Sequence, residues 1–229
     1  MHLADARSAD TTGAQLVLVP VGSLEQHGPH LPLDTDTVIA TAVAVAVGEE
    51  LGGWVAPPLA YGSSGEHQSF AGTTSIGTDA LRTTVVELVR SMRTWSDRVV
   101  LVNGHGGNIT ALSAAVDQLM AEGHAVECVP CATELVDLHA GRTETSLMLH
   151  LSSRTVRLRL AEAGDTRPLA EILPLLREGG VAAVSANGVL GDPDGATAAE
   201  GAIVLRAMVD DVIRRLVPTD VVPIDVAAR

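Results

Sequence analysis

Five side chains that can bind a metal or carry a proton lie in the stretch GSLEQHGPHLPLDTDT, from Gly22 to Thr37. They are Glu25, His27, His30, Asp34 and Asp36. Glu25 and His27 are two positions apart, so both project to the same side if the segment is extended. Carboxylates and imidazoles together suit a divalent transition metal. A solvated polar loop, with Asp34 or Asp36 capping the next helix, accounts for the same residues about equally well.

Two further polar clusters occur later in the chain. His105 lies in VLVNGHGGN, where three glycines let the backbone approach a ligand or another segment closely. The stretch DLHAGRTETSLML contains Asp137, His139 and Glu144. His139 can serve as a general acid–base group, and Glu144 can bind metal or complement a helix dipole. Each cluster also has a plain alternative, as a tight solvated turn or a loop.

The elements that must position these clusters are strands alternating with helices. Strands are predicted at 15–22, 97–103 and 125–130, each a short apolar run. Helices are predicted at 35–51, 79–95, 109–123, 143–151, 168–180 and 198–217. Asn108 is expected to cap the helix that follows it, and Pro174 to weaken the second half of its helix. The segment 155–160 is predicted as a strand or sheet edge.

This alternation predicts one layered α/β domain over residues 1–229 with a mainly parallel sheet. Ligands of such folds bind beyond the carboxyl ends of the strands, and the first two clusters directly follow predicted strands. The segment 54–78 is long and rich in Gly, Ser and Pro, which is typical of a functional loop. Residues 1–13 and 219–229 are expected to be mobile tails.

Composition argues against several partners. The net charge of −13 repels nucleic acid and anionic membranes, and only 2% of residues are aromatic, which leaves few surfaces for base stacking. The longest apolar run, VIATAVAVAV, is about half of a membrane span. No apolar run follows a basic flank at the N-terminus. We therefore expect no nucleic-acid or membrane partner and a cytoplasmic location.

A C-x-x-C pair is formed by Cys128 and Cys131 in ECVPCA. A redox motif would begin a helix after a strand, whereas this pair lies in a strand-like run containing Pro130. A four-cysteine zinc site would need a second pair. Two incidental small residues are the favoured interpretation.

Four stretches together resemble the creatininase family of metal-dependent amidohydrolases. They are VPVGSLEQHGPHLPLDTDT, GEHQSFAGTTSIG, VNGHGGN and HAGRTETS, in family order over more than half the chain. The resemblance implies a three-layer α/β/α sandwich, two divalent ions (Zn, Fe or Mn), and a homohexamer or other homo-oligomer. It places metal ligands at Glu25, His27, Asp36, His105 and Glu144. Asp36 would bridge the two ions, and His139 and Glu144 would be catalytic.

The chain departs from creatininases proper at one point. Those enzymes have a Tyr-Glu pair after the Gly-His, and its Glu is a ligand, whereas Gly106 and Gly107 stand here. Glu144 is expected to supply the missing carboxylate. The smaller residues leave room for a larger substrate, and later segments are similar to a peptidase of the family, so a peptide end is expected instead of creatinine.

Four more residues receive expected supporting roles. His30 and Asp34 would orient metal ligands, whereas Glu66 and His67 would lie on the substrate side. A plain structural loop role is slightly favoured for His67. The alternative functions are a family amidohydrolase acting on a small amide or formamide, and a non-catalytic metal-binding scaffold.

Overall fold

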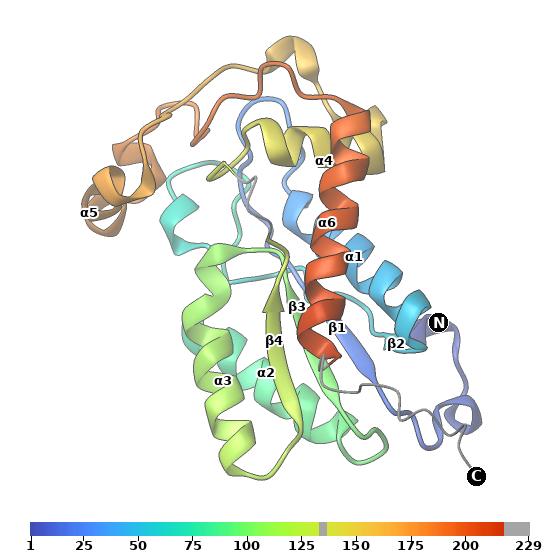
Figure 1. Cartoon of the computed structure of the whole chain (residues 1–229). Coiled ribbons are helices and arrows are strands. Elements are labelled where there is room, and N and C mark those ends of the chain that lie inside the picture. Colours follow the sequence, from blue (N-terminus) through green and yellow to red (C-terminus); the bar gives the residue numbers. More distant parts are fainter. Residues whose placement is uncertain (133–136, 218–229) are drawn as a thin grey trace, which may run out of the picture.

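The centre of the molecule is a parallel four-stranded sheet. The computed structural model describes residues 1–132 and 137–217. The strands are β1 (Val17–Val21), β2 (Trp54–Val55), β3 (Val99–Asn103) and β4 (Val126–Pro130), in the order β2-β1-β3-β4 (Figure 1). Every pairing is parallel, with Val17 opposite Val99 and Val99 opposite Val126. The carboxyl ends of β1 and β3 therefore lie side by side.

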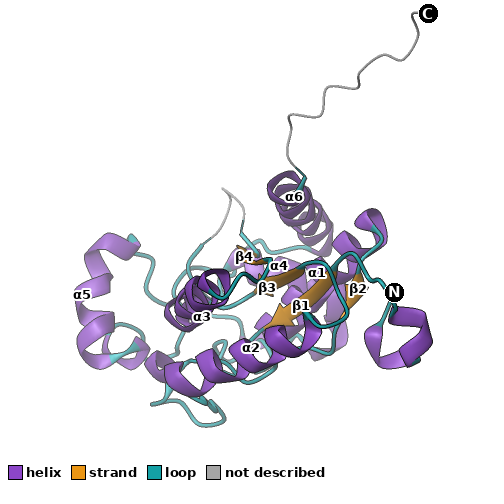
Figure 2. Ribbon diagram, turned by 90° about the horizontal axis from the view of Figure 1, so that it is seen from below, coloured by secondary structure: helices purple, strands orange, loops and turns teal. Residues whose placement is uncertain are grey.

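Helices cover both faces of the sheet. On one face lie α1 (Thr35–Leu51) and α6 (Ala198–Leu216), and on the other lie α2 (Thr78–Met92) and α3 (Ile109–Ala121) (Figure 2). Leu18 and Val100 face the first layer, whereas Val19 and Leu101 face the second. Both faces are buried, which explains why the strands are apolar throughout instead of alternating. The predicted three-layer α/β/α sandwich is confirmed.

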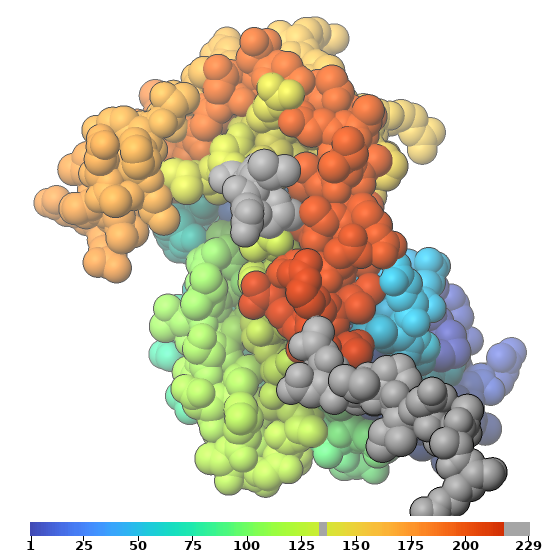
Figure 3. All heavy atoms as spheres, viewed as in Figure 1, coloured from blue at the N-terminus to red at the C-terminus, as the bar shows by residue number. Residues whose placement is uncertain are grey.

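Two more helices lie beyond the carboxyl ends of the strands. The helix α4 (Arg142–Ser152) packs against α6 and α1, which brings its first turn towards the ends of β1 and β3. The helix α5 (Leu169–Gly179) stands apart from the body of the molecule, at the left of Figures 1 and 3. It has its own small core, in which Ile172 packs with Val181 and Leu190.

Three local predictions are wrong. The segment 155–160 forms 3-10 turns, at Ser153–Thr155 and Leu158–Leu160, and no strand. The helix α5 continues through Pro174 to Gly179. Proline there removes one internal hydrogen bond, which the packing of Ile172 and Leu176 on neighbouring segments offsets. The segment 54–78 is predicted as a loop, but its first two residues form the short strand β2. Two residues are too few to show the apolar run that predicts a strand.

The N-terminal residues contact the sheet. Residues Leu3–Asp5 and Ser8–Thr11 form 3-10 turns, and the backbone N–H of Val55 donates to the Met1 carbonyl over 2.8 Å. The structure therefore records a docked segment where the sequence predicts a mobile tail at 1–13. The predicted tail at 219–229 lies outside the described residues. Among the helices described, none combines the length and apolarity that crossing a membrane requires.

Candidate metal centre

The first turn of α1 lies against the ends of two strands, and this contact depends on glycine. A Cβ added to Gly22, after β1, would lie 2.5 Å from the Thr37 Cα, and one added to Gly104, after β3, would lie 2.6 Å from the Asp36 carbonyl oxygen. Neither position has room for a larger residue. The two glycines thus let Asp36 approach the loop after β1 and the turn after β3.

One group of potential ligands combines Glu25, Asp36 and His105. All three are buried, and one ligand atom from each lies within 4.8 Å of the others. His105 Nε2 lies 3.2 Å from Glu25 Oε2, and His105 Nδ1 lies 3.4 Å from Asp36 Oδ2. Three residues predicted to bind the same ions thus meet, although 80 positions separate Glu25 from His105.

A second group combines His27, Asp36 and Glu144. His27 Nε2 lies 3.1 Å from Asp36 Oδ1 and 3.8 Å from Glu144 Oε2. Glu144 is held in place by the backbone N–H of Ala140, which donates to its Oε2 over 2.6 Å. Asp36 belongs to both groups and presents a different oxygen to each. This is the arrangement expected for two ions that share one carboxylate.

The donor atoms themselves test whether metal fits here. Glu25 Oε1 and Asp36 Oδ2 are buried and accept no hydrogen bond within the described structure. Leaving a buried charged oxygen unsatisfied costs more than about 1–3 kcal/mol. A divalent cation would satisfy both atoms, and a mixed set of imidazoles and carboxylates suits Zn, Mn or Fe. The residues therefore fit the metal ions that the sequence predicts.

The ionisation of the metal-free site follows from burial and from the neighbouring charges. Burial disfavours a charged His27, but the carboxylates of Asp36, Glu144 and Glu25 outweigh it and raise its pKa to about 10. The pKa of His105 is likewise raised, against burial, by Glu25 and Glu66. Burial and the nearby Glu25 raise the pKa of Asp36 to about 6. Protons on the two imidazoles thus balance carboxylate charge that a divalent ion would otherwise balance.

Two other histidines remain neutral beside these groups. His139 Nδ1 lies 3.8 Å from Glu25 Oε1, and its ring centre is 4.3 Å from that of His27. Burial and the charge of His27 lower the pKa of His139 to about 4. His67 Nε2 lies 3.4 Å from the same Glu25 oxygen, and burial and His139 lower its pKa to about 3. Both rings can therefore act as neutral hydrogen-bonding groups at neutral pH.

The loop 62–76 brings His67 to the centre. Asn108 supports this loop, because its Oδ1 accepts the backbone N–H of Ser63 and its Nδ2 donates to the Gly22 carbonyl. Asn108 is the N-cap residue of α3, as predicted, but its side chain makes no capping hydrogen bond. The loop also contacts the first cluster directly, as Thr73 Oγ1 accepts the backbone N–H of Gln26.

Of the four predicted supporting residues, His30, Glu66 and His67 reach the centre. His30 is buried, and its Nε2 lies 2.8 Å from Thr145 Oγ1, next to Glu144. Glu66 Oε1 lies 3.3 Å from His105 Nε2. The structure leaves Asp34 outside, because its side chain is exposed at the N-cap of α1 and does not cap the helix. Two residues separate Asp34 from Asp36, and the turn of the helix directs only the latter inwards.

The two glycines after His105 differ in their surroundings. A Cβ on Gly106 would meet nothing within 4 Å, whereas one on Gly107 would lie 2.3 Å from Glu66 Oε1. The space next to Gly107 is thus already filled by a carboxylate from another loop. Only Gly106 leaves the additional room that the sequence suggests.

Sequence reasoning missed two polar residues of this centre. Ser23 Oγ donates to Glu25 Oε2 over 2.7 Å. Gln26 is 5% exposed and contacts both His67 and His139. In the sequence, Gln26 is marked only by its position between Glu25 and His27. A neutral residue between two ligands has no spacing or charge pattern that predicts a role.

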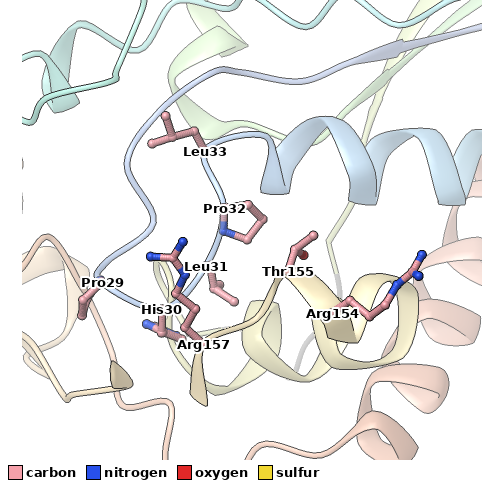
Figure 4. A pocket seen from close by; sticks show the side chains of 8 residues that line it. All are labelled: Pro29, His30, Leu31, Pro32, Leu33, Arg154, Thr155 and Arg157. Atoms are coloured by element: carbon pink, nitrogen blue, oxygen red, sulfur yellow. The ribbon is translucent and has the colours of Figure 1, made fainter. Parts of the chain in front are cut away.

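A surface cavity shares a wall with this centre. It has a volume of about 390 Å³ and is bounded by residues 29–33, Arg154, Thr155 and Arg157. Figure 4 shows His30 and the two arginines around it. His30 belongs to both places, since it also contacts Thr145 beside Glu144. In the described part of the chain, Arg154 and Arg157 form no ion pair with a carboxylate, so the cavity offers positive charge next to the acidic centre.

The cysteines belong to different sides of the sheet. Cys128 packs against the core that contains α2 and α3, whereas Cys131 packs against the core that contains α1 and α6. Both are free thiols. Among the described residues, the groups of potential metal ligands include neither cysteine.

A three-layer α/β/α fold with paired ligand groups at its strand ends is typical of a metal-dependent hydrolase. The family profile described as "Creatininase: Creatinine amidohydrolase" matches residues 1–216. This chain belongs to the creatininase family, a family of metal-dependent amidohydrolases.

Curated relatives agree with that assignment. The "Mycofactocin precursor peptide peptidase" of Mycobacterium ulcerans (strain Agy99) is 56% identical over 209 residues, which cover 87% of this chain and 84% of the relative. The protein of the same name from Mycolicibacterium smegmatis (strain ATCC 700084 / mc(2)155) is 55% identical over 88% of this chain and 84% of its own.

Solved structures give the same family. A structure described as "Creatininase Mn" has a TM-score of 0.79 and 28% identity, covering 95% of this chain and 98% of its own. A creatininase mutant of "Zn-Zn type" has a TM-score of 0.79 and 27% identity, with the same coverage. The predicted family and hydrolase class are therefore confirmed.

Proposed function

We propose that this chain is a peptidase that hydrolyses an amide C–N bond in the mycofactocin precursor peptide and releases its modified, Val-Tyr-derived C-terminal end. The observation that carries this proposal is the pair of ligand groups that share Asp36, with the neutral His139 beside them. The relatives that bear this name align with most of the chain, which supports the choice of substrate.

Two divalent ions are part of the proposal. Glu25, Asp36 and His105 would hold one, and His27, Asp36 and Glu144 the other. When bound, such ions lower the pKa of a shared water and polarise the amide carbonyl. Zinc and manganese are supported by the solved relatives that are described with them, and iron fits the same donors.

The protein's own side chains supply the proton transfer. His139 Nδ1 faces Glu25 at the edge of the ligand groups, so it can take a proton from the attacking water and pass it to the leaving nitrogen. His67 Nε2 faces the same carboxylate from the substrate loop and can hydrogen-bond to the substrate. Burial of both rings keeps bulk water from competing for these protons.

A peptide fits the surroundings better than a small cyclic amide. Gly106 leaves open space beside His105, and the cavity at Arg154 and Arg157 lies on the other side of His30. Arg154 and Arg157 line this cavity, so it can hold a negatively charged group of a bound peptide. This arrangement supports a substrate with a carboxylate.

The decisive experiment incubates the metal-loaded protein with the modified precursor peptide and measures the masses of the products. Cleavage near the C-terminus, which requires metal and is lost after chelation, is expected. A panel of formamides and small amides, including creatinine, runs in parallel, because a deformylase from Methanobrevibacter smithii is 35% identical over 44% of this chain. An intact peptide together with turnover of a small amide would select that alternative activity.

Assembly and location complete the proposal. A homohexamer or other homo-oligomer is supported by exposed leucines on the segment that carries α5: Leu158, Leu160, Leu169 and Leu175. Light scattering on the purified protein measures the assembly, and a monomeric mass would contradict it. Free cysteines are typical of a reducing compartment and support a cytoplasmic location.

A further inference from the structure

A single buried amide connects the ligand segment to two of the histidines at the centre. Gln26 lies between Glu25 and His27 and is 5% exposed. Its Nε2 lies 2.8 Å from His67 Nδ1, 2.9 Å from the Gly188 carbonyl and 3.1 Å from His139 Nε2. Its own backbone carbonyl lies 2.8 Å from His139 Nε2. Side chain and backbone of one residue thus contact both rings.

Two backbone groups independently fix the orientation of this amide. The backbone N–H of Gly28 can only donate, and it lies 2.8 Å from Gln26 Oε1. The carbonyl of Gly188 can only accept, and it lies next to Nε2. Gly188 has a φ of 82°, and a Cβ there would lie 1.9 Å from Gln26 Oε1. Oxygen and nitrogen of the amide therefore cannot be exchanged.

Counting hydrogens then gives the state of His67. The Nε2 group of glutamine has two hydrogens. One is directed to the Gly188 carbonyl, and the other is left for His67 Nδ1, the nearest remaining atom. His67 Nδ1 must accept it and so carries no hydrogen. The ring of neutral His67 therefore has its hydrogen on Nε2, which faces Glu25 Oε1.

The state of His139 follows from the backbone carbonyl of Gln26. A carbonyl oxygen cannot donate, so a separation of 2.8 Å requires a hydrogen on His139 Nε2. Both amide hydrogens of Gln26 are already directed elsewhere, so the 3.1 Å approach of the two Nε2 atoms is only a close contact. Neutral His139 therefore leaves its Nδ1 bare, on the side of Glu25.

We propose that Gln26 is a positioning residue that sets the tautomers of His67 and His139, so that His67 presents an N–H and His139 presents a bare nitrogen to the same centre. This inference rests on the proposed function in assigning the proton transfer to His139. The water oxygen bonds to the amide carbon and gives its proton to His139 Nδ1. The C–N bond then breaks, and the leaving nitrogen takes that proton. The Nε2–H of His139 keeps its hydrogen bond to the Gln26 carbonyl throughout. His67 meanwhile donates to the substrate and keeps its proton.

The direct test is nuclear magnetic resonance of histidine nitrogens. Long-range ¹H–¹⁵N spectra distinguish the two neutral tautomers, and the protein is measured both metal-free and zinc-loaded. His67 and His139 are both expected as Nε2–H tautomers at neutral pH. A hydrogen on Nδ1 of either neutral ring would overturn the inference. No substrate is present, so this result is independent of whether the peptide is cleaved.

The variant Gln26→Glu removes the donors and keeps the size. A carboxylate cannot donate to His67, so the Nδ1 of that ring should acquire a hydrogen. His67 then no longer donates to the substrate, so we expect KM to rise about tenfold, with bound metal unchanged. His139 keeps its tautomer, because its partner is the backbone carbonyl of residue 26. The matched control is Gln68→Glu, an exposed neighbour of His67, which should change neither quantity.

Two outcomes of the variant would contradict the role of Gln26. One is a wild-type KM with wild-type tautomers. The other is a loss of metal in proportion to the loss of activity, which would make Gln26 a support of the ligands alone. If the variant fails to fold, the wild-type spectra still decide the tautomers.

Discussion

Asp36 and His27 form the closest contact between two predicted ligands, with 3.1 Å between Asp36 Oδ1 and His27 Nε2. The other oxygen of Asp36 faces His105 over 3.4 Å.

Because one carboxylate serves two groups, Asp36→Asn should remove an oxygen ligand from one ion. We expect bound metal to fall from two ions per chain to one or none. Activity should fall about 10³-fold, since metals supply several kcal/mol. Elemental analysis measures the metal, and the exposed Asp34→Asn is the control; equal losses in both variants would refute the sharing.

Glu144 and Glu66 are the two carboxylates that can replace the ligand missing at Gly107. Glu144 Oε2 lies near His27, whereas Glu66 Oε1 lies near His105 and partly faces solvent. We expect Glu144→Gln to weaken binding of the second ion by more than about 10²-fold, and Glu66→Gln by less than about tenfold. Zinc titration against a competing chelator measures both. The opposite order would make Glu66 the ligand.

His139→Ala distinguishes an enzyme from a scaffold that only stores metal. His139 forms a further potential ligand group with Glu25 and His27, but it completes neither group around Asp36, so we expect both ions to stay bound. Turnover of the peptide should fall about 10²–10⁴-fold, the usual effect of losing a general acid–base group. His150→Ala, at an exposed position of α4, is the control. Unchanged turnover in His139→Ala would exclude the proton-transfer role.

Arg157 offers a test of the cavity beside His30. A hydrogen bond to a charged group contributes about 1.5–3 kcal/mol, so Arg157→Gln should raise KM at least about tenfold for a peptide with a free carboxylate. The value of kcat and the KM of a neutral, amidated peptide should not change. Arg177→Gln, on the exposed side of α5, is the matched control. An equal rise for both peptides would show that the cavity does not recognise the charge.

Cys128 should be unreactive in the folded protein. Burial raises the pKa of its thiol to about 11, from 9.0, so little thiolate exists at neutral pH. Labelling with a disulfide reagent should be slow at pH 7.5, faster as the pH approaches 11, and rapid after unfolding. A raised pKa in the folded state also means that this group's contribution to stability is present below pH 9 and lost as the pH rises through about 11. Rapid formation of a Cys128–Cys131 disulfide at neutral pH would restore the redox alternative.

The sequence was sufficient to predict the fold class and to place most of the candidate ligands at one edge of the sheet. Apolar runs of strand length alternate with helical ones, and parallel strands bring their carboxyl ends to one edge. Glu25 and His105 follow two such strands, so their meeting could be predicted without coordinates. The pattern could not show β2, which has two residues, or exclude a strand at 155–160.

The sequence by itself determined which residue types gather at the strand ends. Only the tertiary structure decided which of them act together. Asp34 and Asp36 are the same residue type, two positions apart. The first turn of α1 packs against Gly22 and Gly104, which buries Asp36, whereas Asp34 stays exposed at the N-cap. Gln26 shows the same limit, since its contacts with His67, His139 and Gly188 span 41, 113 and 162 positions. Hydrogen-bond geometry at such separations depends on packing of the whole chain, and no local pattern encodes it.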